Sequence, residues 1–505
     1  MPVPNSQAGH EGRRRSPYGR RIALLLTAFA VRALTLTAQG LWRDEVDQWR
    51  FAFLSLSELL SNLTRPGWNG PLYSIVLRGW IALTGESVFA MRYLSVLCGL
   101  LSLALGYALA RRLWGRRVGW LALWLPALSP YLVWYAQEIK MYAWVPMLAL
   151  IALYALDRAC RTPRAVLWLT VFLATTLAIY SHILAALLMP VLGLWFLWHP
   201  SRARQAWAGA LVVAAGLTLP YLPLLRWQAA LAWMPRETGF PRYNLGEMAM
   251  ALLNGWSVGI RQGAWARQEV LIAAMFLYGG LTLLGLLGSP RRSVDGRTVW
   301  RRVLSLVTWL LLPLLGIWLL SLRGPIFTDR YLIWSAPAFY MLVALGVDRL
   351  WRWHTGPAWL ALGLLTLLSV HGLWVQATDP IKPEFAQAAA TVDAGWAAGD
   401  LLLFQIPYNR LVYEVYGAAR DDDVAEAPYT NWRDAGGDYL VDGAYVGREL
   451  RRLVANRDRI WLIYSEARLW DDRELVKGWL DTTYDLAGAT HYVGVSVLLY
   501  VRPAR

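Results

Sequence analysis

The sequence predicts an α-helical membrane protein with many spans, followed by a small α/β domain. Of 505 residues, 57% are hydrophobic and only 16% are charged, and 30 are tryptophan. This composition overrules the two or three soluble domains that length alone would suggest. Apolar runs of about 20 residues recur along the chain, each long enough to cross a bilayer as a helix. From residue 383 the pattern changes to short, alternating helix-like and strand-like runs.

The distribution of charge favours a membrane protein over a nucleic-acid-binding one. The formal charge is +15, but residues 379–505 hold 20 acidic and 14 basic residues, a net −6, so the rest of the chain carries +21. That excess falls in short loops between apolar runs, as the positive-inside rule expects, and a nucleic-acid patch would not require this spacing. Cys98 lies inside one apolar run and Cys160 at the end of another, where neither looks like half of a disulfide.

The first apolar run, residues 22–38, follows a basic stretch that ends at Arg21. A cleaved signal peptide is the less favoured interpretation, because Arg32 interrupts the apolar core and many further spans follow. An arginine at that depth must reach outward or face the protein interior, since a charge facing lipid is costly. Residues 1–21 are therefore predicted to be cytoplasmic, and the first helix leads out of the cytoplasm.

Basic flanks define about ten further spans, giving about 11 in total. Segment 70–83 contains Pro71 and Arg78 and is short for a crossing, so we expect it to lie at the membrane surface. An odd number of spans puts the C-terminus outside, in a multi-pass protein of the plasma (inner) membrane. The predicted parts are a membrane domain at 22–376, whose first outer loop is 39–87, and an extracytoplasmic domain at 377–505. The further spans are expected at 88–110, 118–135, 142–156, 165–180, 182–198, 206–225, 270–287, on both sides of an outer turn at 323–331, and at 357–375, with a long outer loop containing Trp233, Pro235, Pro241 and Trp256.

In the C-terminal region, strands are predicted at 401–406, 460–464 and 493–501, and helices at 384–396, 446–455 and 474–480. This region shows no glycine-rich phosphate loop, metal-ligand spacing or nucleophile elbow. The acidic run 421–423 is interpreted as a solvated loop rather than a metal site. The position of the domain outside the membrane would suit the selection of an acceptor.

Polar side chains gather at one level, the predicted outer ends of the helices. Asp44, Glu45 and Asp47 follow the first span and are bracketed by Trp42 and Trp49. A hydrated loop is the ordinary interpretation of such acids, but the tryptophans favour the membrane boundary and cations lie on neighbouring outer turns. The sequence therefore predicts a polar cavity facing the outer leaflet, formed by Asp44, Glu45, Asp47, Arg92, Gln137, Glu138, Lys140, Tyr180, Ser181, His182, Arg323, Asp329 and Arg330.

Segment 135–142 supplies the second group of candidates. At helical spacing Tyr135, Glu138 and Tyr142 share one face while Lys140 points elsewhere, although a plain helix-end ion pair is the alternative. A structural histidine and an ordinary helix-end arginine are likewise the alternatives for His182 and Arg330. The substrate-binding residues are expected to be Glu138, Gln137, Tyr142, His182 and Asp47. The cations expected at a donor phosphate, which an arginine fork fits well, are Lys140, Arg330 and, more weakly, Arg92.

Five segments together resemble one family: Leu41-Trp42-Arg43-Asp44-Glu45, Asn69-Gly70-Pro71-Leu72-Tyr73, the segment from Tyr135 to Ala143, Tyr180-Ser181-His182, and Asp329-Arg330-Tyr331-Leu332. Over about residues 20–350 the chain is similar to the bacterial membrane glycosyltransferases related to protein O-mannosyltransferases and to the lipid A aminoarabinose transferase. The resemblance implies the GT-C fold, a catalytic aspartate in the first outer loop, a polyprenyl-phosphate sugar donor and inversion at the anomeric carbon. Two positions depart from the family pattern: Trp68-Asn69-Gly70 stands where a histidine is usual, and Lys140 where an arginine is common.

These observations predict a glycosyltransferase with Asp44 as general base and Glu45 beside it in the catalytic pair. Nucleotide sugars are made in the cytoplasm, so an outer site favours a lipid-linked donor, and the acceptor is expected to be an envelope protein, lipid or glycan. No cofactor is expected to be required, although Asp44 and Glu45 could hold a divalent ion such as Mg or Mn. A flippase of a lipid-linked saccharide is the main alternative, but it would more naturally carry charges at the bilayer midplane. A scaffold would leave the acids without a role.

Overall fold

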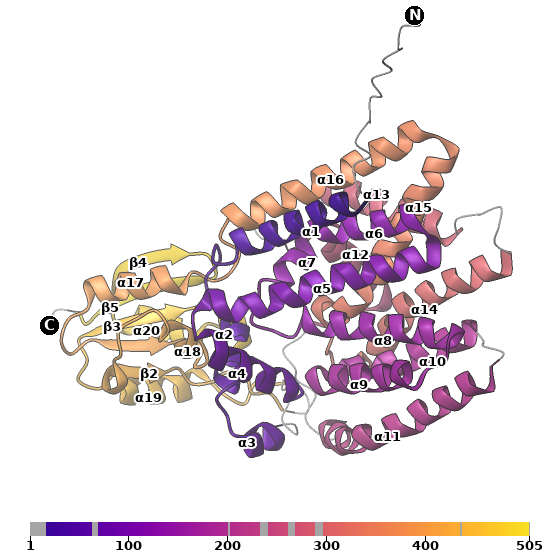
Figure 1. Ribbon diagram of the computed structural model, residues 1–505. Coiled ribbons are helices and arrows are strands. Elements are labelled where there is room, and N and C mark those ends of the chain that lie inside the picture. The colour runs from indigo at the N-terminus through magenta and orange to yellow at the C-terminus, as the bar shows by residue number, and fades with distance from the viewer. Residues whose placement is uncertain are drawn as a thin grey trace, which may run out of the picture.

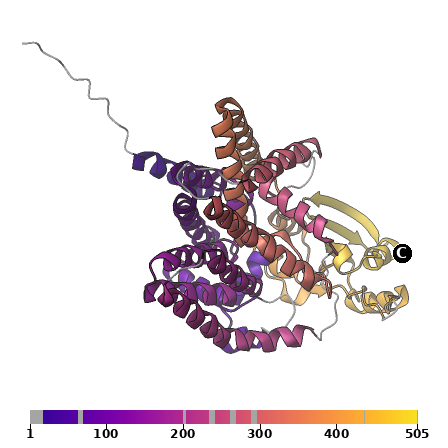
Figure 2. The ribbon, with the colours of Figure 1, turned by 90° about the vertical axis from the view of Figure 1, so that its right-hand side faces the viewer.

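The computed structural model describes residues 17–62, 69–199, 203–232, 241–260, 268–287, 296–434 and 437–503. Helices occupy the chain as far as Thr378, and a five-stranded sheet domain follows. The sheet domain lies at one end of the helical bundle, as both ribbon views show (Figures 1 and 2). The protein is thus a mostly helical, multi-span membrane protein with a C-terminal mixed sheet, as predicted. Residues 1–16 of the basic N-terminus, Trp68, Trp233 and Pro235 lie outside the described residues.

Every predicted span is helical in the structure. Six helical segments in the described part of the chain are long and apolar enough to cross a membrane on their own: Val88–Trp114, Arg204–Arg226, Gln268–Leu286, Gly296–Ser321, Asp329–Trp353 and Thr355–Thr378. The number of spans, about 11, therefore stays a prediction. The helices at the predicted spans are α1 (Pro17–Leu34), α5 (Val88–Trp114), α6 (Arg116–Leu128), α7 (Pro130–Tyr135), α8 (Trp144–Arg161), α9 (Ala165–Ser181), α10 (Leu188–Trp198), α11 (Arg204–Ala232), α13 (Gln268–Leu286), α14 (Gly296–Ser321), α15 (Ala336–Trp353) and α16 (Thr355–Thr378).

Arg32 faces the protein interior and stabilises a helix break. Its side chain is 1% exposed, and its guanidinium donates to the carbonyls of Ala28, Ala127 and Pro126 at 3.0, 2.9 and 3.2 Å. The chain turns between α6 and α7, where Pro130 has no N–H to give to the Pro126 carbonyl. The arginine therefore satisfies carbonyls that the proline leaves without a helical donor.

Three short helices follow α1: α2 (Arg43–Phe51), α3 (Leu56–Ser61) and α4 (Leu72–Thr84). The 13 residues of α4 are fewer than a crossing needs, which agrees with the surface position predicted for segment 70–83. Gly70 precedes α4 in close contact with the end of α9, because a Cβ there would meet the Tyr180 carbonyl oxygen at 1.8 Å. This contact explains the glycine of the Asn69-Gly70-Pro71 motif.

The long loop predicted around Trp256 contains a helix that was not predicted. This helix is α12 (Leu245–Val258). A capping box formed by Asn244 and Glu247 begins it, and Gly259, with φ +83°, follows its end. Met248, Leu252 and Trp256 are buried. At 14 residues α12 is too short to be recognised as a span, and its packing against neighbouring helices shows only in three dimensions.

The C-terminal domain contains β1 (Leu401–Phe404), β2 (Val424–Glu426), β3 (Arg459–Tyr464), β4 (Asp485–Tyr492) and β5 (Val495–Val501) in the order β2-β1-β3-β5-β4. The first three strands are parallel, and β5 is antiparallel to both β3 and β4. The three predicted strands and three predicted helices are confirmed, while β2 is too short and β4 too exposed to have been recognised. The domain's helices are α17 (Phe385–Gly395), α18 (Asn409–Tyr413), α19 (Gly443–Leu453) and α20 (Leu475–Thr483).

The acidic run 421–423 forms a short 3₁₀ helix, η5. Asp423 accepts a hydrogen bond from Arg457 at 2.6 Å, so this acid is engaged in an ion pair.

Gln39 connects the segment after the first helix of the bundle, α1, to the segment after the last, α16. The Gln39 amide nitrogen donates to the carbonyls of Gln376 and Asp379 at 3.0 and 2.8 Å, and its amide oxygen accepts from the backbone of Ile381 and Lys382 at 2.9 and 3.2 Å. The chain that leaves α1 is therefore fastened to the chain that leaves α16. This connection places α2 beside α18 of the C-terminal domain (Figure 1).

Candidate functional site

Asp44 lies in the first turn of α2, at the bundle end next to the sheet domain (Figure 1). Its carboxylate is 26% exposed and its Oδ2 lies 3.3 Å from Nη2 of Arg330. Burial alone raises the pKa of Asp44, but the charges of Lys140, Arg330 and Arg43 outweigh burial and lower it below its ordinary value. Asp44 is therefore an ionised, accessible carboxylate, which is the state that a general base requires.

Two cations flank this carboxylate. Lys140 is 7% exposed and has no carboxylate within 4.0 Å among the described residues. Arg330 lies in the 3₁₀ helix η4 (Asp329–Ser335), with its guanidinium carbon 5.5 Å from the ring centre of Trp42 and 5.9 Å from that of Tyr142. Its Nε is buried without a hydrogen-bond partner in the described part of the chain. These donors give an anion a place to bind beside Asp44.

Arg92 does not fit the predicted role at a phosphate. All five of its N–H groups are used: Nε and Nη2 donate to Glu45 at 2.8 Å each, and the others to the carbonyls of Leu36, Gln39 and Gly40 at 2.8 to 2.9 Å. The side chain is 1% exposed. Arg92 thus stabilises the turn between α1 and α2 and has no donor left for a ligand.

Glu45 is the partner of Arg92 and is equally occupied. It accepts from both Arg92 groups, from Nζ of Lys382 at 2.7 Å and from the Ile139 backbone at 3.1 Å, and it is fully buried. Burial alone would raise the pKa of Glu45, but the charges of Arg92 and Lys382 lower it to about 2. This geometry supports a positioning role and leaves Glu45 unsuited to bind sugar or a metal ion. Among the described residues, no group of three His, Cys, Asp or Glu side chains is placed to hold a metal.

Glu138, unlike Glu45, has carboxylate oxygens that are not occupied by hydrogen bonds within the described part of the chain. It is fully buried, and neither carboxylate oxygen accepts a hydrogen bond from a described residue. The nearest cation is Lys382, whose Nζ lies 3.7 Å from Oε1. Burial raises the pKa of Glu138 to about 7, although Lys382 opposes the shift. A carboxylate with unused acceptor capacity fits the predicted binding of substrate hydroxyls.

Three other predicted substrate-binding residues differ in their surroundings. Gln137 donates to the Arg32 carbonyl and the Thr35 hydroxyl at 2.8 and 2.6 Å, so it fastens its turn to α1 and does not face the site. Asp47 is 24% exposed and pairs with Arg43 at 3.6 Å. Tyr142 is buried, close to Arg330. Asp47 and Tyr142 thus lie near the cations, and Gln137 does not.

His182 is buried with its ring centre 5.0 Å from that of Tyr331. Its Nδ1 accepts from the Leu184 backbone at 3.3 Å, which puts the ring proton on Nε2. Nε2 is buried and has no hydrogen-bond partner in the described ranges. The ring also feels the charges of Arg330 and Lys140, so its free N–H is a third donor near the proposed anion position.

Three residues of the C-terminal region reach the site without having been predicted. Lys382 contacts Glu45 and Glu138. The Arg43 guanidinium carbon lies 3.5 Å from the ring centre of Tyr408, and Glu466, at φ +46°, interacts electrostatically with Arg43 and Asp44. Tyr408 and Glu466 follow the parallel strands β1 and β3, so the carboxyl edge of the sheet faces α2. No local motif marks any of them.

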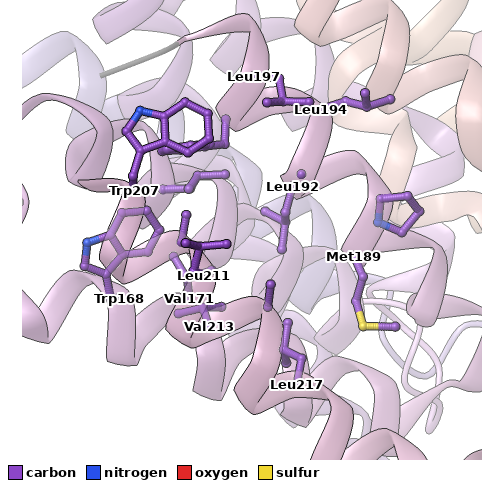
Figure 3. Close-up of a pocket in the computed structure, with 16 residues that line it drawn as sticks. Trp168, Val171, Met189, Leu192, Leu194, Leu197, Trp207, Leu211, Val213 and Leu217 are labelled. Carbon is purple, nitrogen blue, oxygen red and sulfur yellow. The ribbon is translucent and has the colours of Figure 1, made fainter. Parts of the chain in front are cut away.

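A hollow elsewhere in the bundle is lined without ionisable side chains. It encloses about 630 Å³ between α8, α9, α10 and α11. Figure 3 shows Trp168, Met189, Leu192 and Trp207 among the apolar side chains that line it.

Comparison with known proteins points to one class of enzyme. The family model for dolichyl-phosphate-mannose-protein mannosyltransferase matches residues 66–227. The undecaprenyl phosphate-alpha-4-amino-4-deoxy-L-arabinose arabinosyl transferases of Pseudomonas aeruginosa and Pseudomonas paraeruginosa are each 29% identical over 408 residues, which is 76% of this chain and 71% of theirs.

Two solved structures share the fold. The crystal structure of ArnT from Cupriavidus metallidurans in the apo state matches with a TM-score of 0.57 and 14% identity, over 95% of this chain and 98% of that one. The Archaeoglobus fulgidus oligosaccharyltransferase in the apo form matches with a TM-score of 0.52 and 12% identity, over 91% of this chain and 71% of that one.

Proposed function

We propose that this chain, a membrane glycosyltransferase of the GT-C class, moves a sugar from a polyprenyl-phosphate carrier to an acceptor hydroxyl, with Asp44 as general base. The observation that carries the proposal is the accessible carboxylate of Asp44, paired with Arg330 at 3.3 Å and acted on by the charge of Lys140. The donor class is supported by the undecaprenyl phosphate in the names of the Pseudomonas relatives.

The reaction is an inverting displacement. The acceptor oxygen attacks the anomeric carbon, the bond from that carbon to the phosphate oxygen breaks, and Asp44 takes the acceptor proton. The polyprenyl phosphate leaves with one more negative charge than it had in the donor. Lys140 and Arg330 stabilise that charge, so the leaving group needs no proton.

The pairing of Asp44 with Arg330 couples the two halves of this reaction. Before transfer, the Asp44 carboxylate balances the Arg330 guanidinium at 3.3 Å. Once Asp44 is protonated it is neutral, and Arg330 regains its full attraction for an anion. The cation is therefore released to the phosphate as the phosphate gains its charge.

We propose that the reaction needs no resident metal ion. Divalent ions often neutralise a leaving phosphate, and here Lys140 and Arg330 are placed to do so. Glu45, the second acid that the sequence offers as a metal ligand, already accepts from Arg92, Lys382 and a backbone N–H.

The proposed site faces the outside of the plasma membrane, and the acceptor is an envelope protein, lipid or glycan. Support comes from the charge pattern of the loops and from the position of the acidic C-terminal domain, which lies at the same end of the bundle as Asp44 (Figure 1). Glu466 is exposed and Tyr408 is half-buried, both lie close to Arg43, and they supply groups for contact with the acceptor.

The test uses purified protein in detergent with a radiolabelled polyprenyl-phosphate sugar and a crude envelope extract. Label on an envelope component with wild-type protein, and none with Asp44→Asn, supports the proposal. Movement of the labelled lipid across liposomes without any transfer would support a flippase and overturn it.

A further inference from the structure

We propose that Lys382, which lies between α16 and the C-terminal domain, is a positioning residue that keeps Glu138 as a free carboxylate in the sugar-binding site. This inference rests on the proposed function and adds a residue that lies outside every motif of the membrane domain. The charge of Glu138 is the property that Lys382 controls.

The contacts of Lys382 are those of a buried bridge between two acids. Its side chain is 4% exposed, with Nζ 2.7 Å from Oε2 of Glu45 and 3.7 Å from Oε1 of Glu138. The ring centres of Trp42 and Trp134 lie 5.7 and 5.2 Å from the same Nζ. Burial lowers the pKa of Lys382, and the charges of Glu45 and Glu138 oppose this shift. The two aromatic faces add further attraction for the ammonium.

Charge balance in this cluster depends on Lys382. Arg92, Glu45, Lys382 and Glu138 form a buried group of two cations and two anions with no net charge. The Arg92 guanidinium donates to Glu45 and to backbone carbonyls. Among the described residues, Lys382 is the cation that lies within 4.0 Å of Glu138. A neutral side chain at 382 would leave one buried negative charge unbalanced, and protonation of Glu138 is the least costly way to remove it.

The direction of the effect on pH dependence follows from the groups around Glu138. Burial raises the pKa of Glu138 to about 7, and Lys382 is the strongest influence that opposes this rise. Without the Lys382 charge the pKa of Glu138 rises further, so the carboxylate form is reached only at higher pH. The ionisable groups around Glu138 are Lys382, Glu45, Asp44, Arg330, Arg92, Tyr73, Tyr135 and Tyr142.

The backbone fixes Lys382 in this position. Its N–H donates to the Gln39 amide oxygen at 3.2 Å, next to the same bond from Ile381. The ammonium therefore enters the site from a segment clamped between α1 and α16. This geometry is what distinguishes a positioning residue from a mobile surface lysine.

The experiment compares the pH–rate profiles of wild type, Lys382→Met, Lys382→Arg and Glu138→Gln in full-length protein in detergent. With Lys382→Met we expect the acid limb to move to higher pH by about one unit or more, with the rate recovering as pH rises. Lys382→Arg keeps a cation and should restore the wild-type limb. Glu138→Gln should remove the limb, and a Lys382→Met change added to it should then move nothing.

A second measurement needs no turnover. Infrared spectra during a pH titration report the carbonyl stretch of a protonated carboxylic acid, and the band absent from Glu138→Gln identifies Glu138. That band should persist to higher pH in Lys382→Met, and Lys382→Gln serves if the methionine variant does not fold. Wild-type protein without transfer activity would reject the proposed function alone, since the infrared shift still tests this inference.

A uniform loss of rate at every pH in Lys382→Met, with the infrared band unmoved, would show a merely structural lysine and overturn the inference.

Discussion

Asp44 and Glu45 are neighbours in α2, yet their carboxylates lie in opposite surroundings. Glu45 points into the bundle, where Arg92, Lys382 and a backbone N–H occupy its oxygens. Asp44 is 26% exposed, and among the described residues its ion pair is the one with Arg330 at 3.3 Å. We call the first group, Glu45 with Arg92, the saturated cluster, and the second, Asp44 with Lys140 and Arg330, the open cluster. Saturated polar groups maintain geometry, and groups with unused donors or acceptors remain available for chemistry.

Asp44→Asn should break the open cluster and have the largest effect. The amide keeps the size of the side chain but cannot take the acceptor proton, so transfer should fall by about 10²–10⁴-fold. Since the pKa of Asp44 is lowered, wild-type Asp44 stays ionised at mildly acidic pH and should not set the acid limb. Initial rates with the labelled donor measure the change. Full turnover with unchanged melting behaviour would contradict the proposed base.

Glu45→Gln, the same chemical change one residue later, should act on stability. It leaves two buried cations without their carboxylate, and breaking such a pair costs about 3–5 kcal/mol. Thermal unfolding in detergent measures the loss. Arg452→Met is the control, because its ion pair with Glu449 is 81% and 35% exposed and contributes at most about 1 kcal/mol. Equal melting temperatures for Glu45→Gln and wild type would remove the distinction between the two clusters.

Lys140→Met tests the cation of the open cluster that lacks a partner carboxylate. Losing one donor to the developing phosphate charge should lower the rate by about 10²–10³-fold with little change in stability. Lys477→Met provides the control, since Lys477 pairs with Asp481 on the C-terminal domain, away from the site. Loss of activity in both variants to the same extent would argue against a specific phosphate contact.

Chelation should have the smallest effect. Because the proposed mechanism assigns the neutralisation of the leaving phosphate to Lys140 and Arg330, EDTA should leave the rate of the wild-type enzyme unchanged. Titration of EDTA against initial rate checks this expectation. A loss of activity that Mg²⁺ or Mn²⁺ restores would show that the open cluster works with a metal ion.

Much of the fold could be read from sequence because apolar runs and basic flanks are strong local signals. The helices at the predicted spans, the short helix α4 and the main strands of the C-terminal domain were predicted from such signals. Helix α12 and strand β4 were not, since their identity depends on what packs against them. Local patterns specify elements, and tertiary contacts decide the marginal ones.

The sequence identified most residues of the candidate site, but not which of them make structural contacts and which keep unused donors or acceptors. Asp44, Glu138, Lys140 and Arg330 do come together, because several helices meet at the end of the bundle next to the C-terminal domain. The sequence could not show that every N–H group of Arg92 donates to another protein group, since this depends on where the carbonyls between α1 and α2 lie.

Lys382 was missed because 337 positions separate it from Glu45. One signal was present in the sequence. The chain has only three lysines among 49 basic residues, and two of them, Lys140 and Lys382, lie in the site.

The Gln39 clamp has a consequence for biosynthesis. A nascent chain inserts its helices in order, so α2 and its acids are already in place while the partners of Gln39 are still on the ribosome. Glu45 must wait for its second cation until translation has passed the last bundle helix. A chain that ends before residue 382 would therefore lack both the second cation of Glu45 and two of the backbone partners of Gln39.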